Sequence, residues 1–272
     1  MSVGKKAMGN GEKAMNLVLL EKRDGYAIVT LNRPDEMNAL SRDLRKQFVQ
    51  VFEECSADKN IRVIILTGNG RAFCAGFDLK ELGSDNSGNA ADEVNNALAW
   101  AMDAFDGPII GAINGHAITG GFEMALACDV LIASENARFA DTHARVGILP
   151  GWGLSQKLPR LIGLSRAKEV SFTGAPVFAQ QAYEWGLVNH VYPADELLDK
   201  AMEMAENMCA CVPHILKQYK PLIEDGYSMP LKEAMPWEEA QAIESAKQAS
   251  AWMIEQRRKQ VLDKGRSEKN DG

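Results

Sequence analysis

The chain has 272 residues, of which 46% are hydrophobic and 25% are charged, a composition typical of globular proteins and unlike that of disordered ones. Thirty basic against 37 acidic residues leave a formal net charge of -7, which argues against binding to nucleic acid or to an anionic membrane surface. No apolar run approaches the roughly 20 residues that span a bilayer, and the five cysteines lack the paired spacing of a zinc site. We therefore expect a cytoplasmic protein with reduced thiols and no metal.

The N-terminal region predicts an extension followed by a hairpin. Residues 1–15 combine lysines with small residues, so we expect a flexible extension there. Residues 16–21 and 26–32 are aliphatic runs on either side of an Arg-Asp-Gly turn at 23–25. Two such runs joined by a glycine-containing turn are typical of a β-hairpin.

A helix and then a buried strand are predicted after the second strand of the hairpin. Ser41 is a suitable N-cap for a helix over residues 42–55, where apolar residues recur at helical spacing. The nearly unbroken apolar run at residues 62–68 is typical of a strand buried on both faces. This order indicates an α/β crossover.

The α/β pattern then repeats. Residues 82–91 (LGSDNSGNAA) are small and polar, which predicts a mobile loop before a helix over 92–105. A short apolar strand is expected at 108–113, a helix at 122–128 and a further strand at 130–133. We expect one α/β core over most of this region.

The last part of the chain is predicted to be mostly helical. We expect one α/β core over residues 16–200, a helical region over 201–272 and a frayed tail from residue 264. The expected helices beyond residue 160 cover 166–171, 180–185, 195–208 and 238–262.

Two glycine-containing turns follow predicted strands, at residues 72–79 and 114–123. Glycine allows a tight turn and a close approach of the backbone to a ligand, and the second turn leads into a helix whose first amides lack partners. Two such amides can form an oxyanion hole. Glycines between a strand and a helix are also common as packing residues, so both interpretations remain open at this point.

Five segments resemble, in order and spacing, the signature blocks of the crotonase superfamily (enoyl-CoA hydratase/isomerase family). The resemblance implies an α/β fold, a crotonase-like spiral of ββα units with a C-terminal helical trimerisation region. The segments are residues 31–40 (LNRPDEMNAL), 66–79 (LTGNGRAFCAGFDL), 113–129 (INGHAITGGFEMALACD), 147–151 (GILPG) and 185–189 (WGLVN).

The same resemblance implies an oxyanion hole and a coenzyme A groove. The backbone amides of Phe77 and Gly120 would hold the thioester oxygen as it becomes enolate-like. Phe77 stands where the family commonly has alanine, so we expect its ring to narrow or reshape the acyl pocket. Met37, Ala39 and Ala75 match positions that line the groove, Asp78 and Leu79 match positions that support the turn, and Lys80 would meet a coenzyme A phosphate. These six are the expected substrate- and coenzyme A-binding positions.

Family hydratases use two glutamates that share one water, because one group takes a proton as the other supplies one. Glu123 matches the first glutamate, whereas the second position falls on His143. Histidine exchanges protons near neutral pH, so His143 either replaces the missing acid/base or serves a different reaction. Asp141 is a poor stand-in because nothing in the family pattern places it at the water, and Arg145 either holds a substrate carboxylate or pairs with Glu123.

The resemblance therefore implies a hydro-lyase that adds water to 2-enoyl-CoA thioesters without a cofactor, since coenzyme A is part of the substrate. Other crotonase-type reactions stay open, namely enoyl-CoA isomerisation and carbon–carbon bond hydrolysis, as does a weakly catalytic acyl-CoA-binding protein. A homotrimer, or a hexamer made of two trimers, is also implied. Acyl chain length, stereochemistry and pathway stay open.

Overall fold

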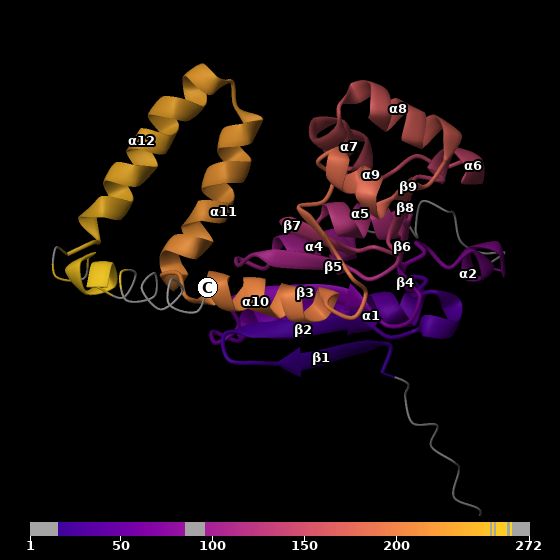
Figure 1. Cartoon of the computed structure of the whole chain (residues 1–272), viewed down its shortest axis with the longest axis horizontal. Helices are drawn as coiled ribbons and strands as arrows, with labels where there is room; N and C mark the ends of the chain where they lie inside the picture. Colours follow the sequence, from indigo (N-terminus) through magenta and orange to yellow (C-terminus); the bar gives the residue numbers. More distant parts are fainter. Residues whose placement is uncertain (1–15, 85–95, 251, 253, 260–261, 263–272) are drawn as a thin grey trace, which may run out of the picture. The chain divides into compact units, whose positions relative to one another are not determined.

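The computed structural model describes residues 16–84, 96–250, 252, 254–259 and 262. The chain divides into two compact units, Met1–Leu216 and Lys217–Gly272 (Figure 1). The predicted extension at residues 1–15 and the predicted frayed tail from residue 264 lie outside the described residues.

Among the described residues of the first unit, six strands form the larger sheet, in the order β1-β2-β3-β5-β7-β10. The predicted hairpin is confirmed: β1 and β2 are antiparallel, with Val18 opposite Leu31, and the remaining neighbours are parallel. The strands are β1 (Val18–Lys22), β2 (Tyr26–Leu31), β3 (Val63–Gly68), β5 (Ile109–Ile113), β7 (Val130–Ser134) and β10 (His190–Tyr192).

Helix α1 (Arg42–Ala57) packs into the main hydrophobic core of this unit. The predicted cap is confirmed, because the Ser41 hydroxyl accepts a hydrogen bond from the Leu44 amide at 3.3 Å. Phe48 and Phe52 lie one turn apart, are fully buried, and stack with ring centroids 4.4 Å apart. Burial of each ring contributes about 1.5–3 kcal/mol.

Strand β3 is buried on both faces, as predicted. Ile64 and Leu66 belong to the core that contains α1, whereas Val63 and Ile65 belong to a second cluster on the opposite face. Side chains alternate along a strand, so an all-apolar strand requires cover on both sides. Helix α10 (Leu197–Cys209) supplies the second cover, and it lies along the sheet in Figure 1.

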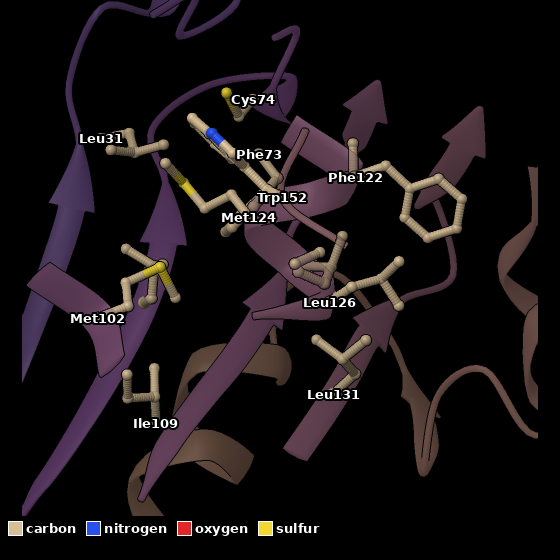
Figure 2. Packing of buried hydrophobic residues seen from close by; sticks show 14 of the residues in the cluster. Leu31, Phe73, Cys74, Met102, Ile109, Phe122, Met124, Leu126, Leu131 and Trp152 are labelled. Carbon is tan, nitrogen blue, oxygen red and sulfur yellow. The ribbon is translucent and has the colours of Figure 1, made fainter. Parts of the chain in front are cut away.

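A second, four-stranded sheet, which was not predicted, has the order β4-β6-β8-β9. Strands β4, β6 and β8 are parallel, and β9 is antiparallel to β8. Phe73 of this sheet shares the main core with Phe122, Trp152 and residues of strand β5 (Figure 2). The strands are β4 (Ala72–Cys74), β6 (His116–Ile118), β8 (Arg138–Ala140) and β9 (Val177–Phe178).

The remaining helices of the first unit adjust several predicted boundaries. Of the loop predicted at residues 82–91, residues 82–84 belong to helix α2 (Leu79–Ser84), and residues 85–91 lie outside the described part. The helix predicted over 92–105 is seen as α4 (Ala97–Asp103), and its residues 92–95 lie outside the described part. The elements are η1 (Pro34–Glu36), α2 (Leu79–Ser84), α4 (Ala97–Asp103), α5 (Gly120–Leu126), α6 (His143–Val146), α7 (Leu154–Ile162), α8 (Leu164–Thr173) and α9 (Ala179–Glu184).

Helices α11 (Pro213–Ser228) and α12 (Leu231–Lys247) form an antiparallel pair, in which the Trp237 ring packs beside Gly226. The single helix predicted over 238–262 is wrong: α12 starts earlier and ends before a non-helical stretch at 248–250. Proline at a helix start is well tolerated, and Pro230 takes the N-cap position of α12. The predicted boundary after residue 200 falls inside α10.

Candidate active site

The two glycine turns meet at the carboxyl ends of strands β4 and β6 in the smaller sheet. Parallel strands β4 and β6 end side by side, so the segments that follow them converge. Gly76 has φ +85°, a conformation suited to glycine. A methyl group built on Gly76 would lie 3.1 Å from the amide nitrogen of Gly120, which shows how closely the two turns approach.

The amides of Phe77 and Gly120 lie at this junction. Gly120 is the first residue of α5, where an amide has no acceptor within its own helix. Neither amide has a hydrogen-bond acceptor within the described part of the chain. The preceding residue Thr119 has φ 54°, and its hydroxyl is hydrogen bonded to the hydroxyl of Thr142. The turn is therefore held in place while its first helical amide stays available.

The ring of Phe77 lies beside the same junction. Its Cδ2 atom is 3.6 Å from the position that a methyl group on Gly120 would take. The ring packs at a tilt against Trp152, with centroids 5.7 Å apart, and the Arg45 guanidinium lies 5.3 Å from its centroid. Such contacts orient an aromatic ring, so Phe77 forms a fixed wall of the site.

Glu123 lies one helical turn after Gly120, on the same side of α5. Its side chain is 2% exposed. Oε1 accepts a hydrogen bond from the Trp152 amide at 2.7 Å, and Oε2 lies 3.4 Å from Nε2 of His143. A buried carboxylate without partners is costly, and these contacts supply the partners while directing one oxygen at His143.

His143 opens helix α6 and is buried against two carboxylates. Its Nδ1 lies 2.7 Å from Oδ1 of Asp141, which also accepts the His143 backbone amide at 3.1 Å. Burial opposes a positive charge on the ring, but the hydrogen bonds and charges of Asp141 and Glu123 outweigh it and raise the pKa of His143 to about 9. Burial likewise opposes the charge of Asp141, whereas hydrogen bonds from His143 and Ser171 hold its pKa below the usual value.

The six groove positions lie on two neighbouring segments beside the turn after β4. The Ala75 amide donates to the Met37 carbonyl at 3.0 Å, and a bridge joins Leu40 to Phe77. Ala39 lies half-buried between these contacts. The structure therefore places the segment that contains Met37 and Ala39 against the segment that carries the Phe77 amide.

The charged members of this group are already engaged within the protein. Asp78 is buried and pairs with Arg33 at 2.6 Å, so its contribution is to hold the turn. Lys80 is exposed and lies 3.1 Å from Glu36, and Leu79 is exposed. Leu79 and Lys80 are therefore accessible to a ligand, whereas the Asp78 side chain is not.

Arg145 and Asp141, two residues near His143 in the sequence, have contacts that differ from each other. Arg145 does not pair with Glu123, because its guanidinium is exposed and donates to the Thr173 carbonyl. The Asp141 side chain binds His143, a contact that was not predicted. The Asp-x-His spacing, in which an aspartate accepts an amide two residues later, is the sequence signal for that contact. Nothing in the sequence pointed to the Trp152 amide that holds Glu123.

The arrangement joins a buried proton-exchanging pair to two available amides. Glu123 and His143 can take up and supply protons, and amides directed at one point stabilise developing negative charge. Groups of three or more residues suited to holding a metal ion are absent from the described residues, and none of the helices described there is long and apolar enough to cross a membrane.

Comparison with known proteins identifies relatives that are enoyl-CoA hydratases. The family model for enoyl-CoA hydratase/isomerase matches residues 21–260. The chain is 43% identical over 228 residues to probable enoyl-CoA hydratase 1, peroxisomal, of Arabidopsis thaliana, covering 84% of this chain and 86% of the relative. It is 36% identical to the short-chain-enoyl-CoA hydratase of Clostridium acetobutylicum, covering 90% and 97%.

A solved structure agrees. Enoyl-CoA hydratase from Bacillus anthracis superimposes with a TM-score of 0.80 at 36% identity, covering 86% of this chain and 92% of that one. The chain belongs to the enoyl-CoA hydratase/isomerase family, the crotonase superfamily expected from its motifs. It is an enoyl-CoA hydratase-like enzyme, a hydro-lyase by class.

Proposed function

We propose that the protein adds water to 2-enoyl-CoA thioesters, with Glu123 as the base and His143 as the acid. The observation that carries this proposal is the buried contact of 3.4 Å between Glu123 Oε2 and His143 Nε2. It joins the two positions that match the paired glutamates of family hydratases, and the histidine retains the ability to exchange a proton. His143 is thus a chemically suitable replacement for the second carboxyl group.

The proposed step balances in atoms and charge. Glu123 takes a proton from water as the water oxygen bonds to the β-carbon of the enoyl group. The electrons of the double bond move onto the thioester, and the amides of Phe77 and Gly120 hold its enolate-like oxygen. The His143 imidazolium then gives a proton to the α-carbon. Proton transfer from Glu123 to His143 across their contact restores both groups.

The other expected properties are part of the same proposal. The reaction consumes only substrate and water, so it needs no cofactor, and coenzyme A arrives as part of the thioester. Met37, Ala39, Ala75, Leu79 and Lys80 would line the coenzyme A groove, because they lie on the two segments beside the oxyanion turn. We further propose a cytoplasmic location and a homotrimer or a dimer of trimers.

The test follows the absorbance of a conjugated short 2-enoyl-CoA after addition of purified protein. We expect rapid loss of absorbance, and about 10²–10⁴-fold slower loss after Glu123→Gln or His143→Gln, as is usual when acid/base catalysis is removed. Two exposed residues provide matched controls, His190→Gln and Glu135→Gln, and both variants should retain the activity.

Product analysis separates the alternatives. A 3-hydroxyacyl-CoA product supports hydration. A shifted double bond indicates isomerisation, and a cleaved carbon–carbon bond in a diketone-like thioester indicates hydrolysis, for which a histidine is also a suitable acid/base. Binding of acyl-CoA without turnover of any of these substrates would overturn the hydratase proposal in favour of a binding protein.

A further inference from the structure

Asp141, His143 and Glu123 form a continuous buried chain of acid/base groups. Asp141 Oδ1 lies 2.7 Å from Nδ1 of the imidazole, and Glu123 Oε2 lies 3.4 Å from Nε2 on the other side of the ring. The side chains of all three are at most 6% exposed. Each ring nitrogen therefore faces a carboxylate, and water has little access to either contact.

We propose that Asp141 is a positioning residue that keeps both nitrogens of the His143 ring protonated and directs Nε2–H at Glu123. His143 consequently enters the reaction as the acid. The role of His143 as the acid rests on the proposed function. The position of the ring and the protonation of its nitrogens do not depend on that function.

The contacts of Asp141 explain why it can hold the ring. Its Oδ1 accepts both the backbone amide and Nδ1–H of His143, so the ring is fixed relative to the start of α6. Ser171 on α8 hydrogen bonds to the same carboxylate. With Nδ1–H engaged, Nε2 is the nitrogen that faces Glu123, as in histidines whose tautomer and orientation are set by a carboxylate partner.

The charges around the ring favour its protonated form. Glu123 from α5 and Asp141 from the segment after β8 are the charged groups that act on His143 among the described residues. Ser171 of α8 is neutral, and the charged side chains of α8 are exposed. Arg145, the cation of α6 itself, is also exposed. The two negative charges of Glu123 and Asp141 together exceed the single positive charge of the imidazolium, so they favour its protonated form.

Asp141→Asn separates the charge of this residue from its shape. An asparagine retains an Oδ1 atom that accepts the His143 amide and Nδ1–H, so the local hydrogen bonds can persist. The negative charge is removed, and the second carboxylate oxygen becomes an NH2 group. A neighbouring opposite charge shifts a pKa by about 1–3 units. A purely structural role for Asp141 predicts no change in the titration of His143 in the folded variant.

The experiment is a pH titration of the histidine ring nitrogens by NMR, on the full chain labelled with nitrogen-15 histidine. The chain has four histidines, and His143→Gln identifies the signals of His143 by difference. Asp129→Asn is the control, because Asp129 also accepts a backbone amide, that of Ile109 at 2.7 Å, but lies outside the chain of three.

In the wild type, we expect both His143 nitrogens to be protonated at pH 7, with a midpoint near the pKa of about 9. Asp141→Asn should lower the midpoint by about 1–3 pH units, and Asp129→Asn should leave it in place. A neutral His143 ring at pH 7 in the wild type would overturn the proposal, as would an unchanged midpoint in folded Asp141→Asn. If Asp141→Asn does not fold, the protonation state of His143 at pH 7 in the wild type is the result that decides.

Kinetics distinguish this inference from the proposed function. If the wild type hydrates an enoyl-CoA, Asp141→Asn should move the alkaline limb of kcat to lower pH by the same shift as the NMR midpoint, with KM nearly unchanged. If hydration is absent while the ring titrates as expected, the proposed function fails and the positioning role of Asp141 holds. If hydration occurs while the ring is neutral, the positioning role fails instead.

Discussion

The backbone and the side chain of Phe77 have separate roles in the proposed site. Its amide lies next to that of Gly120, whereas its ring is packed between Trp152 and Arg45. A substitution that changes the ring leaves the amide in place. The position therefore allows the size of the acyl pocket to be altered without removal of an oxyanion donor.

We expect Phe77→Ala to shift the acyl preference toward longer chains. Removal of the ring leaves space beside Gly120, and each methylene that a pocket accepts or rejects changes kcat/KM by about tenfold or more. The measurement is the ratio of kcat/KM for a ten-carbon and a four-carbon 2-enoyl-CoA. Phe172→Ala, at an exposed phenylalanine on α8, is the control and should leave the ratio unchanged. An unaltered ratio in Phe77→Ala would show that the ring does not limit the pocket.

At the scale of elements, the site depends on the contact between the end of β4 and the start of α5. A methyl group on Gly121 would lie 2.0 Å from the Cys74 carbonyl oxygen, far inside any permitted contact. The nearest atom to a methyl group on Gly120 is 3.5 Å away. Gly121 thus allows the helix to approach the strand closely, and Gly120 faces the open side of the junction.

Adjacent glycines should therefore respond differently to alanine. Gly121→Ala forces the helix and the strand apart, and overpacking of this kind costs about 1–3 kcal/mol or more in the free energy of unfolding. Gly120→Ala makes only ordinary contacts, so its effect on stability should stay below about 1 kcal/mol. Urea unfolding of both variants and the wild type measures the difference. Equal destabilisation by the two substitutions would contradict this account of the β4–α5 contact.

At the scale of the whole molecule, the second unit presents large apolar side chains to solvent in the single chain. Tyr227, Leu231 and Trp252 are 68%, 76% and 71% exposed. Large apolar side chains that are exposed in a single chain become buried when copies associate through them. This favours the proposed assembly of several copies through the C-terminal helices.

We expect a solution mass three or six times the 29.8 kDa of one chain, measured by light scattering after size-exclusion chromatography. Leu231→Glu should lower the mass toward that of the single chain, because a buried unpaired charge is costly at an interface. Lys232→Glu, at the neighbouring exposed position, changes the charge without removing an apolar group and should leave the assembly intact. A monomeric wild type would refute the trimer.

The sequence predicted the elements whose signals are local. The capping serine and apolar spacing of α1 and the continuous apolar run of β3 each depend on residues close together in the chain. The smaller sheet was missed because strands of two or three residues are too short for an alternating pattern. They pair across long separations, as when Ala72 lies opposite His116, and no local signal encodes such a pairing.

The sequence by itself determined the family, the glycine turns and the chemical types at the site, including the histidine in place of a second glutamate. Only the tertiary structure decided which groups meet. In the structure, Arg145 donates to the Thr173 carbonyl, Asp141 contacts His143, and the Trp152 amide donates to Glu123. The physical reason is that hydrogen bonds and ion pairs act over a few ångströms. Whether distant residues come that close depends on how the strands and helices pack.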